Sequence, residues 1–123
     1  MENIYKNDEL LRLTNGCTFI RDSVVTRFDI YLQDHQLCID VYLNLEFSRF
    51  KAEKRLKIHF RDIIRYQFLY SNNYYFYNVE TCKFFKSESG YYISLDPFNE
   101  LGEISEEDED LILCKDIEGY FVS

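Results

Sequence analysis

The chain has 123 residues, of which 46% are hydrophobic, and 11 Phe and 11 Tyr supply its large apolar side chains in the absence of Trp. This composition excludes a disordered chain and suffices for one core, so we expect a single domain over residues 1–123. No apolar run has the length of a membrane span, and residues 1–6 lack the features of a secretory signal, which predicts a cytoplasmic protein without membrane contact.

Charge is distributed unevenly along the chain, whose formal net charge is −8. Residues 1–65 contain 11 Lys and Arg against 10 Asp and Glu, whereas residues 66–123 contain 3 against 12. A negative potential of this kind repels phosphate groups and attracts cationic surfaces. The balance therefore predicts a basic protein as partner and argues against nucleic acid.

A short helix is expected over residues 7–16, where Asn7 or Asp8 can cap the first turn and Gly16 is placed to end it. Residues 24–33 and 37–45 then alternate between apolar and polar side chains, as half-buried strands do. Because the residues between them are polar and turn-prone, the two segments predict an antiparallel hairpin.

The same alternation predicts a third strand over residues 55–60. Arg61 and Asp62 predict a turn, and the aromatic and β-branched side chains that follow predict a fourth strand over residues 63–70. Further strands are expected within residues 74–77, 82–86 and 91–95, separated by polar turns.

The last quarter of the chain is ambiguous between helix and strand, and we expect one helical turn at residues 105–108 followed by a final strand. The fold class that follows is α+β and β-rich. It is a single antiparallel meander sheet of about six or seven strands with a short N-terminal helix.

Four cysteines stand far apart in the sequence and form no Cys-x-x-Cys pair that would suit a metal. In a cytoplasmic protein, we expect them to be reduced and partly buried thiols. They are Cys17, Cys38, Cys82 and Cys114.

Catalytic chemistry has little support in the sequence, because only two histidines could serve as a general base. His35 falls in the predicted hairpin turn, and His59 alternates outward with Arg55 and Lys57, so both are expected to be solvated. We therefore predict that the chain is not an enzyme. The alternative is a small-ligand or enzymatic site on the concave face of the sheet, formed by Asp96, Tyr92 and His59.

Five consecutive acids form the densest charge in the chain: Glu106, Glu107, Asp108, Glu109 and Asp110. Such a run repels itself, so a partner of opposite charge is a reasonable explanation for it. The hypothesis is an acidic edge that steers a basic protein toward the domain. A merely solvated acidic turn is the alternative.

Calcium is a further alternative, because oxygen-donor side chains are frequent between Asp96 and Asp108. With Asp96 as first ligand, the EF-hand spacing places Phe98 at the third position and Leu101 where glycine is required. The spacing fails, and no metal or cofactor is expected.

Two other surface features each have a functional and a structural interpretation. Residues 49–65 form a basic stretch that either meets nucleic acid or neutralises the C-terminal acids within the fold, and the acidic total favours the second. Tyr74, Tyr75 and Tyr77 flank Phe76 in an aromatic run whose side chains cannot all point inward along one strand. Exposed rings here would serve as anchors for a partner.

The order of several short motifs resembles that of small uncharacterised bacterial domains, some of which are similar to immunity proteins of polymorphic toxin systems. The motifs are Arg21-Asp-Ser23, Phe60-Arg-Asp-Ile63, Tyr92-Ile-Ser-Leu-Asp-Pro97 and Ser105-Glu-Glu-Asp-Glu-Asp110. The resemblance implies a non-enzymatic cytoplasmic inhibitor that occludes a toxin domain. It transfers no functional residue, because these families contact their toxins through divergent surfaces, and Arg21 stands where the common pattern has His.

Overall fold

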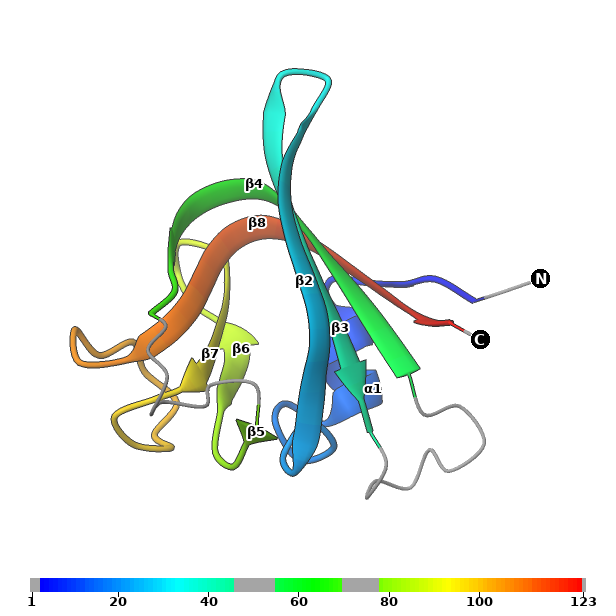
Figure 1. The fold of residues 1–123 in the computed structure, drawn as a ribbon. Coiled ribbons are helices and arrows are strands. Elements are labelled where there is room, and N and C mark those ends of the chain that lie inside the picture. The colour runs from blue at the N-terminus through cyan, green and yellow to red at the C-terminus, as the bar shows by residue number, and fades with distance from the viewer. Residues whose placement is uncertain (1–2, 46–54, 70–77, 123) are drawn as a thin grey trace.

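The computed structural model describes residues 3–45, 55–69 and 78–122. Its elements are β1 (Tyr5–Lys6), α1 (Asp8–Thr14), β2 (Ser23–Gln33), β3 (Gln36–Asn44), β4 (Arg55–Gln67), β5 (Asn78–Val79), β6 (Lys83–Lys86), β7 (Tyr91–Asp96) and β8 (Glu109–Val122). The predicted fold class is confirmed, with one short helix and a single antiparallel sheet that curls into a half-barrel (Figure 1).

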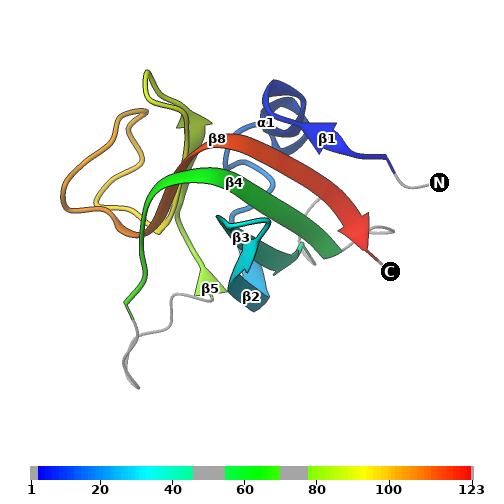
Figure 2. The same cartoon turned by 90° about the horizontal axis from the view of Figure 1, so that it is seen from above.

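The sheet consists of two meanders that meet at its centre. The strand order is β5-β2-β3-β4-β8-β7-β6, so β2 to β4 follow one another, and β6 to β8 follow one another in the opposite sense. Strands β4 and β8 join the two halves through the longest ladder of the sheet. Figure 2 shows these two strands arching together between the β2–β3 pair and the α1 side.

The predicted hairpin is present as β2 and β3, paired from Val24–Asn44 to Gln33–Gln36. Asp34 and His35 form its two-residue turn with φ angles of 53° and 67°. Positive φ at both central positions is the type I′ geometry that matches the twist of two strands. The end of this hairpin projects beyond the rest of the sheet (Figure 1).

One strand replaces the predicted turn at Arg61 and Asp62. Asp62 adopts a left-handed conformation with φ 51°, and the register against β8 shifts between Ile63 and Arg65. This is a β-bulge, which bends a strand without ending it. The prediction of separate third and fourth strands was therefore wrong, since both segments belong to β4.

The helix has the expected length of two turns, but its N-terminus differs from the prediction. Neither predicted cap bonds the first turn, because the Asn7 side chain instead accepts the backbone N–H of Ile117 on β8. The helix is thereby tied to the central strand. At the C-terminus, Asn15 and Gly16 both adopt positive φ, and the Gly16 N–H donates to the Leu11 oxygen at 3.0 Å, so the helix ends at Gly16 as predicted.

The core fills the inner side of the curled sheet and the space below α1. Alternate residues of each strand point into it, and Leu10 of the helix packs so closely against β8 that a Cβ on Gly119 would lie 2.4 Å from the Leu10 Cδ1 atom. The fully buried members include Leu10, Ile20, Ile39, Leu43, Leu56, Ile58 and Ile117. Helix α1 has seven residues, and no described helix is long and apolar enough to cross a membrane.

A disulfide joins Cys17 and Cys82, whose Cα atoms lie 5.9 Å apart across a sequence separation of 65. The prediction of four reduced thiols was therefore wrong for this pair. Cys38 and Cys114 are free and buried, as expected. The sequence around the two cysteines does not predict this disulfide, because the segments that contain Cys17 and Cys82 come together only through the curl of the sheet.

Replacing Gly90 tests the packing of the β6–β7 turn against the central strand. Its φ is +151°, and an added Cβ would lie 2.3 Å from the backbone oxygen of Cys114. Since backbone cannot yield as a side chain can, we expect Gly90→Ala to lower the free energy of unfolding by about 3 kcal/mol in urea titrations. Gly102→Ala, with nothing within 4 Å, is the control and should change it by less than about 0.5 kcal/mol.

Removal of the disulfide tests its contribution to stability. Closing a loop of 65 residues restricts the unfolded chain by about 4 kcal/mol in the chain-entropy account. We expect Cys17→Ser/Cys82→Ser to lose up to that amount in urea titrations while the folded spectrum is kept. An unchanged urea midpoint would show that the bond does not constrain the unfolded state.

Candidate functional site

The connection between β7 and β8, here called the 97–107 loop, is held from beneath by a buried ion pair. The Lys83 ammonium on β6 lies 3.0 Å from Oδ1 and 3.1 Å from Oδ2 of Asp108, which follows the loop. Lys83 is 3% exposed and Asp108 1%. A buried ion pair is stable only when its remaining hydrogen-bonding groups are also satisfied.

Three further hydrogen bonds of this pair organise the loop. The Asp108 carboxylate accepts the backbone N–H of Phe98 at 2.9 Å and that of Ser105 at 3.0 Å. Lys83 donates a further bond to the backbone oxygen of Glu103 at 2.7 Å. Both ends and the middle of the loop are therefore attached to one buried centre.

Tyr92 completes the centre from β7, where its hydroxyl donates to Asp108 Oδ2 at 2.7 Å. Burial opposes the charge on Asp108, but hydrogen bonds from Tyr92, from the two backbone amides and from Lys83 outweigh it, and the pKa of Asp108 is lowered. Burial and the bond to Asp108 raise the pKa of Tyr92. The carboxylate is therefore ionised, and the phenol is its neutral donor.

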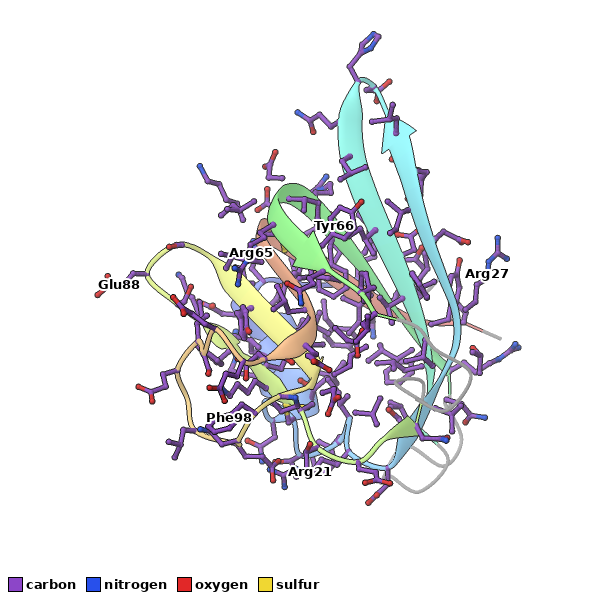
Figure 3. The ribbon with its side chains drawn as sticks, turned by 60° about the vertical axis from the view of Figure 1, so that its left-hand side comes forward. Arg21, Arg27, Arg65, Tyr66, Glu88 and Phe98 are labelled. Carbon is purple, nitrogen blue, oxygen red and sulfur yellow. A yellow bond between two sulfur atoms is a disulfide. The ribbon has the colours of Figure 1, made fainter. Side chains whose placement is uncertain are left out.

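The outer side of the 97–107 loop presents apolar and acidic side chains together. Phe98 is 62% exposed, Leu101 58% and Ile104 39%. The acids that stand among them and are exposed are Glu100, Glu103, Glu106 and Glu107. Figure 3 shows Phe98 on this loop, well apart from Glu88 at the β6–β7 turn.

Most of these acids have no ion-pair partner among the residues that the structure describes. Within the described residues, Glu103, Glu106 and Glu107 take part in no ion pair, whereas Glu100 pairs with Arg21 at 2.7 Å. Unpaired charges on a surface keep their full attraction for an approaching cation. The loop is therefore rigid in its backbone and acidic and apolar at its surface.

The predicted run of five partner-binding acids needs correction. Asp108 is buried in the ion pair, and Asp110 is also fully buried, where it accepts the backbone N–H of Leu69 at 2.9 Å. Neither can belong to an exposed edge. Glu106 and Glu107 are exposed as predicted, and Glu109 is half-buried at the start of β8.

The aromatic anchors predicted at Tyr74, Tyr75 and Tyr77 lie outside the described residues. The sequence analysis missed Phe98, Leu101 and Ile104 as exposed side chains and Lys83 as their support. The signal available was an apolar residue at every third position among acids after Pro97, which is neither a strand nor a helix pattern.

A second polar cluster occupies the outer face of β2, β3 and β4. Asp40 Oδ1 lies 2.6 Å from His59 Nδ1, and Asp40 Oδ2 accepts the Tyr31 hydroxyl at 2.8 Å. The Lys57 ammonium lies 3.7 Å from Asp40 Oδ2. It also lies 5.4 Å from the ring centroid of Tyr42 and 5.3 Å from that of Tyr120. One buried carboxylate thus links three neighbouring strands.

Burial and the Asp40 bond raise the pKa of Tyr31, which stays a neutral donor. Burial opposes the charge on Lys57, but Tyr120 and Asp40 outweigh it and raise the pKa of this ammonium. His59 is 15% exposed at its side chain and bonded to Asp40, so the prediction of a solvated histidine was wrong. His35 is exposed in its turn as expected.

The Asp40–His59 pair resembles the carboxylate–histidine part of a catalytic triad, in which the carboxylate fixes the orientation of the imidazole ring. Within the described part of the chain, however, His59 hydrogen-bonds only with Asp40 and Tyr31, neither of which is a serine or cysteine nucleophile. Burial raises the pKa of the Cys114 thiol to about 12, which keeps it protonated and unreactive at neutral pH.

The three residues of the alternative site do not converge. His59 is opposite Glu118 on β8, whereas Tyr92 is opposite Leu113. Five residues of strand separate these positions by about 16 Å. Among the residues that the structure describes, no group of three or more His, Cys, Asp or Glu side chains is placed to hold a metal ion.

Two of the four Lys and Arg side chains that the structure describes in the basic stretch form ion pairs within the fold. Arg61 pairs with Glu118 at 3.0 Å, and Lys57 and His59 share Asp40. The Lys57 ammonium also faces the Tyr120 ring at 5.3 Å from its centroid. Of these contacts, the Arg61 pair meets a C-terminal acid, as the alternative of internal neutralisation expects, whereas Asp40 belongs to β3. Arg49, Lys51 and Lys54 lie outside the described ranges.

Replacing Lys83 tests whether its charge supports the loop. Lys83→Met leaves the Asp108 carboxylate buried without its cation, and we expect the free energy of unfolding to fall by about 3 to 5 kcal/mol. The double variant Lys83→Met/Asp108→Asn removes the stranded charge and should recover part of that loss.

Lys86→Met on the same strand is the matched control, because Lys86 is exposed and only faces the Tyr91 ring. It should change the free energy of unfolding by less than about 1 kcal/mol. Equal urea midpoints for Lys83→Met and Lys86→Met would contradict the supporting role of the buried pair.

Comparison with protein-family models, with curated proteins and with solved structures found no match for this chain.

Proposed function

We propose that this chain is a non-enzymatic protein-binding module that binds a basic partner through its 97–107 loop. The observation that carries the proposal is the loop itself, which exposes Phe98, Leu101 and Ile104 among unpaired glutamates while its backbone is fixed to a buried ion pair. Large apolar side chains exposed together on one loop favour a contact surface over a solvated turn.

The composition of the loop matches the anatomy of an interface. Binding energy concentrates in a few large apolar side chains, and a polar rim around them excludes water and sets specificity. Phe98 and Leu101 suit the first role, and Glu103, Glu106 and Glu107 suit the second. Because the backbone is already fixed by Asp108 and Lys83, little conformational entropy is lost when a partner binds.

Charge supports the choice of a basic partner. Residues 66–123 carry 12 Asp and Glu against 3 Lys and Arg, and the loop contributes its acids to that half. Long-range attraction of this kind raises the association rate with a cationic protein and falls as salt screens it. A phosphate-rich nucleic acid would be repelled by the same surface.

The biological role that agrees with the resemblance is inhibition of the immunity type, in which the module covers a toxin domain in the cytoplasm. A fixed loop with an exposed aromatic side chain suits occlusion of a basic active site. Cytoplasmic disulfides in most organisms are transient and respond to redox state. In a cytoplasmic protein, the Cys17–Cys82 disulfide would therefore be a reversible bond.

The test is capture of a partner from a lysate of the source organism at low salt, followed by binding kinetics with the purified partner. We expect Glu106→Lys/Glu107→Lys to reduce the association rate about tenfold at low salt. Phe98→Ala should weaken equilibrium binding by about 2 kcal/mol, mainly through faster dissociation.

Glu9→Lys/Glu88→Lys is the matched control, since it makes the same change of net charge at exposed positions on α1 and at the β6–β7 turn. It should alter the association rate far less than the loop variant. Equal rates for the two charge variants, together with unchanged binding by Phe98→Ala, would overturn the proposed role of the loop.

A further inference from the structure

The disulfide lies next to the side chains that hold the 97–107 loop. Cys82 is followed directly by Lys83, whose ammonium binds the Glu103 backbone oxygen and the Asp108 carboxylate. A displacement of Cys82 therefore also moves Lys83, which forms the buried ion pair with Asp108 and the hydrogen bond to Glu103 of the loop.

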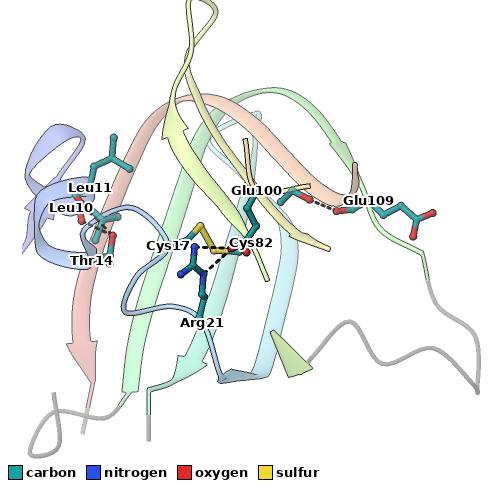
Figure 4. Close-up of a disulfide and its surroundings, with 9 residues drawn as sticks. Leu10, Leu11, Thr14, Cys17, Arg21, Cys82, Glu100 and Glu109 are labelled. Carbon is teal, nitrogen blue, oxygen red and sulfur yellow. Dashed lines mark hydrogen bonds and ion pairs between the residues drawn. A yellow bond between two sulfur atoms is a disulfide. The ribbon is translucent and has the colours of Figure 1, made fainter. Parts of the chain in front are cut away.

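The other half of the disulfide supports a second attachment. Arg21 follows Cys17 by four residues, and its backbone N–H donates to the Cys17 oxygen at 3.0 Å. The Arg21 guanidinium binds Glu100 of the loop at 2.7 Å. Figure 4 shows this ion pair beside the disulfide. Both cysteines are thus near an anchor of the same loop.

The disulfide also secures the link between the two edges of the sheet. Strand β6 stands at one end of the strand order, and among the described strands it pairs with β7 alone. Strand β5 precedes β6 in the chain, with three residues between them, and pairs with β2 at the opposite end of the strand order. Cys82 lies in the short link between these two edges, and its bond to Cys17 holds that link against the segment after α1.

We propose that the redox state of Cys17 and Cys82 controls the order of the 97–107 loop, and with it the binding function. In the oxidised protein the loop is fixed and competent to bind. In the reduced protein the link between β5 and β6 relaxes, the anchors at Lys83 and Arg21 loosen, and the loop becomes mobile. The inference rests on the proposed function only for its effect on binding.

A cellular dithiol is the reductant that this step requires. One of its thiolates attacks the Sγ atom of Cys17, the more exposed partner, because Cys82 is only 2% exposed. The electron pair of the broken S–S bond passes to Cys82, whose sulfur takes up a proton. The second thiol of the reductant then displaces Cys17 as a thiol, so the reductant becomes a disulfide while two cysteines are reduced.

Hydrogen exchange of individual amides tests the control of loop order without any partner. The amides of Phe98 and Ser105 donate to Asp108 and report the state of the loop, while the Ile58 amide in β4 reports the core. We expect reduction by dithiothreitol to speed exchange at the two loop amides by about tenfold or more. The Ile58 amide should exchange faster only as far as the lower global stability requires, and it should stay much better protected than the loop amides.

The variant Cys17→Ser/Cys82→Ser is the control for side effects of the reagent. Its loop amides should exchange fast both with and without dithiothreitol. Unchanged loop protection in the reduced native protein would overturn the proposal. Loss of protection at Ile58 to the level of the loop amides would also overturn it, because the disulfide would then hold the whole fold.

A binding measurement separates this proposal from the proposed function. The probe is a fluorescent amphipathic peptide of Lys and Leu, titrated against oxidised and reduced protein. Tighter binding by the oxidised form, by about tenfold, would support both proposals. Faster loop exchange without any peptide binding by either form would leave the redox control standing and would count against the loop as a basic-partner site.

Discussion

The Lys83–Asp108 pair is the interaction on which the candidate site depends. Two charges removed from water are costly unless every remaining donor and acceptor is used, and here they are used by the Tyr92 hydroxyl and by the backbone of the 97–107 loop. The same bonds that satisfy the ion pair therefore define the shape of the loop. The loop has no regular secondary structure, yet its backbone is fixed. Because backbone groups of the loop bond inward to Lys83 and Asp108, its apolar side chains are held toward the outside.

The second cluster, around Asp40, shows the same principle with a different result. Its carboxylate is also buried and shared among several donors, yet those donors are side chains of β2 and β4 in place of loop amides. The effect is to fasten three strands to one another on the outer face. The two carboxylates are chemically alike, and their surroundings alone make one a strand connector and the other a loop organiser.

The β-rich class, the helix and the hairpin could be predicted because they depend on local alternation and turn chemistry. The interpretation of Asp62 failed because a polar residue in the left-handed conformation is typical of a turn and of a bulge alike, and only pairing with β8 distinguishes them. Asp108 and Asp110 were misread for a related reason. Each is buried with a hydrogen-bond partner that is distant in sequence, since Lys83 lies 25 residues from Asp108 and Leu69 lies 41 residues from Asp110. The disulfide and the exposure of Phe98 are likewise set by tertiary contacts that leave no periodic signal.

The insertion of β8 between β4 and β7 has a consequence for how the chain acquires its fold. Strand β8 is the last of the described strands to be synthesised, yet it pairs with β1, β4 and β7 and supplies much of the core. Until it arrives, the β2–β3–β4 meander has an open edge where the centre of the sheet will be, and the helix lacks the strand against which Leu10 packs. Pairing at such distance in sequence is slow because the loop must close before any contact repays it. The sheet is therefore completed only once β8 has been synthesised and is free to pair, and the edge of β4 stays exposed until then.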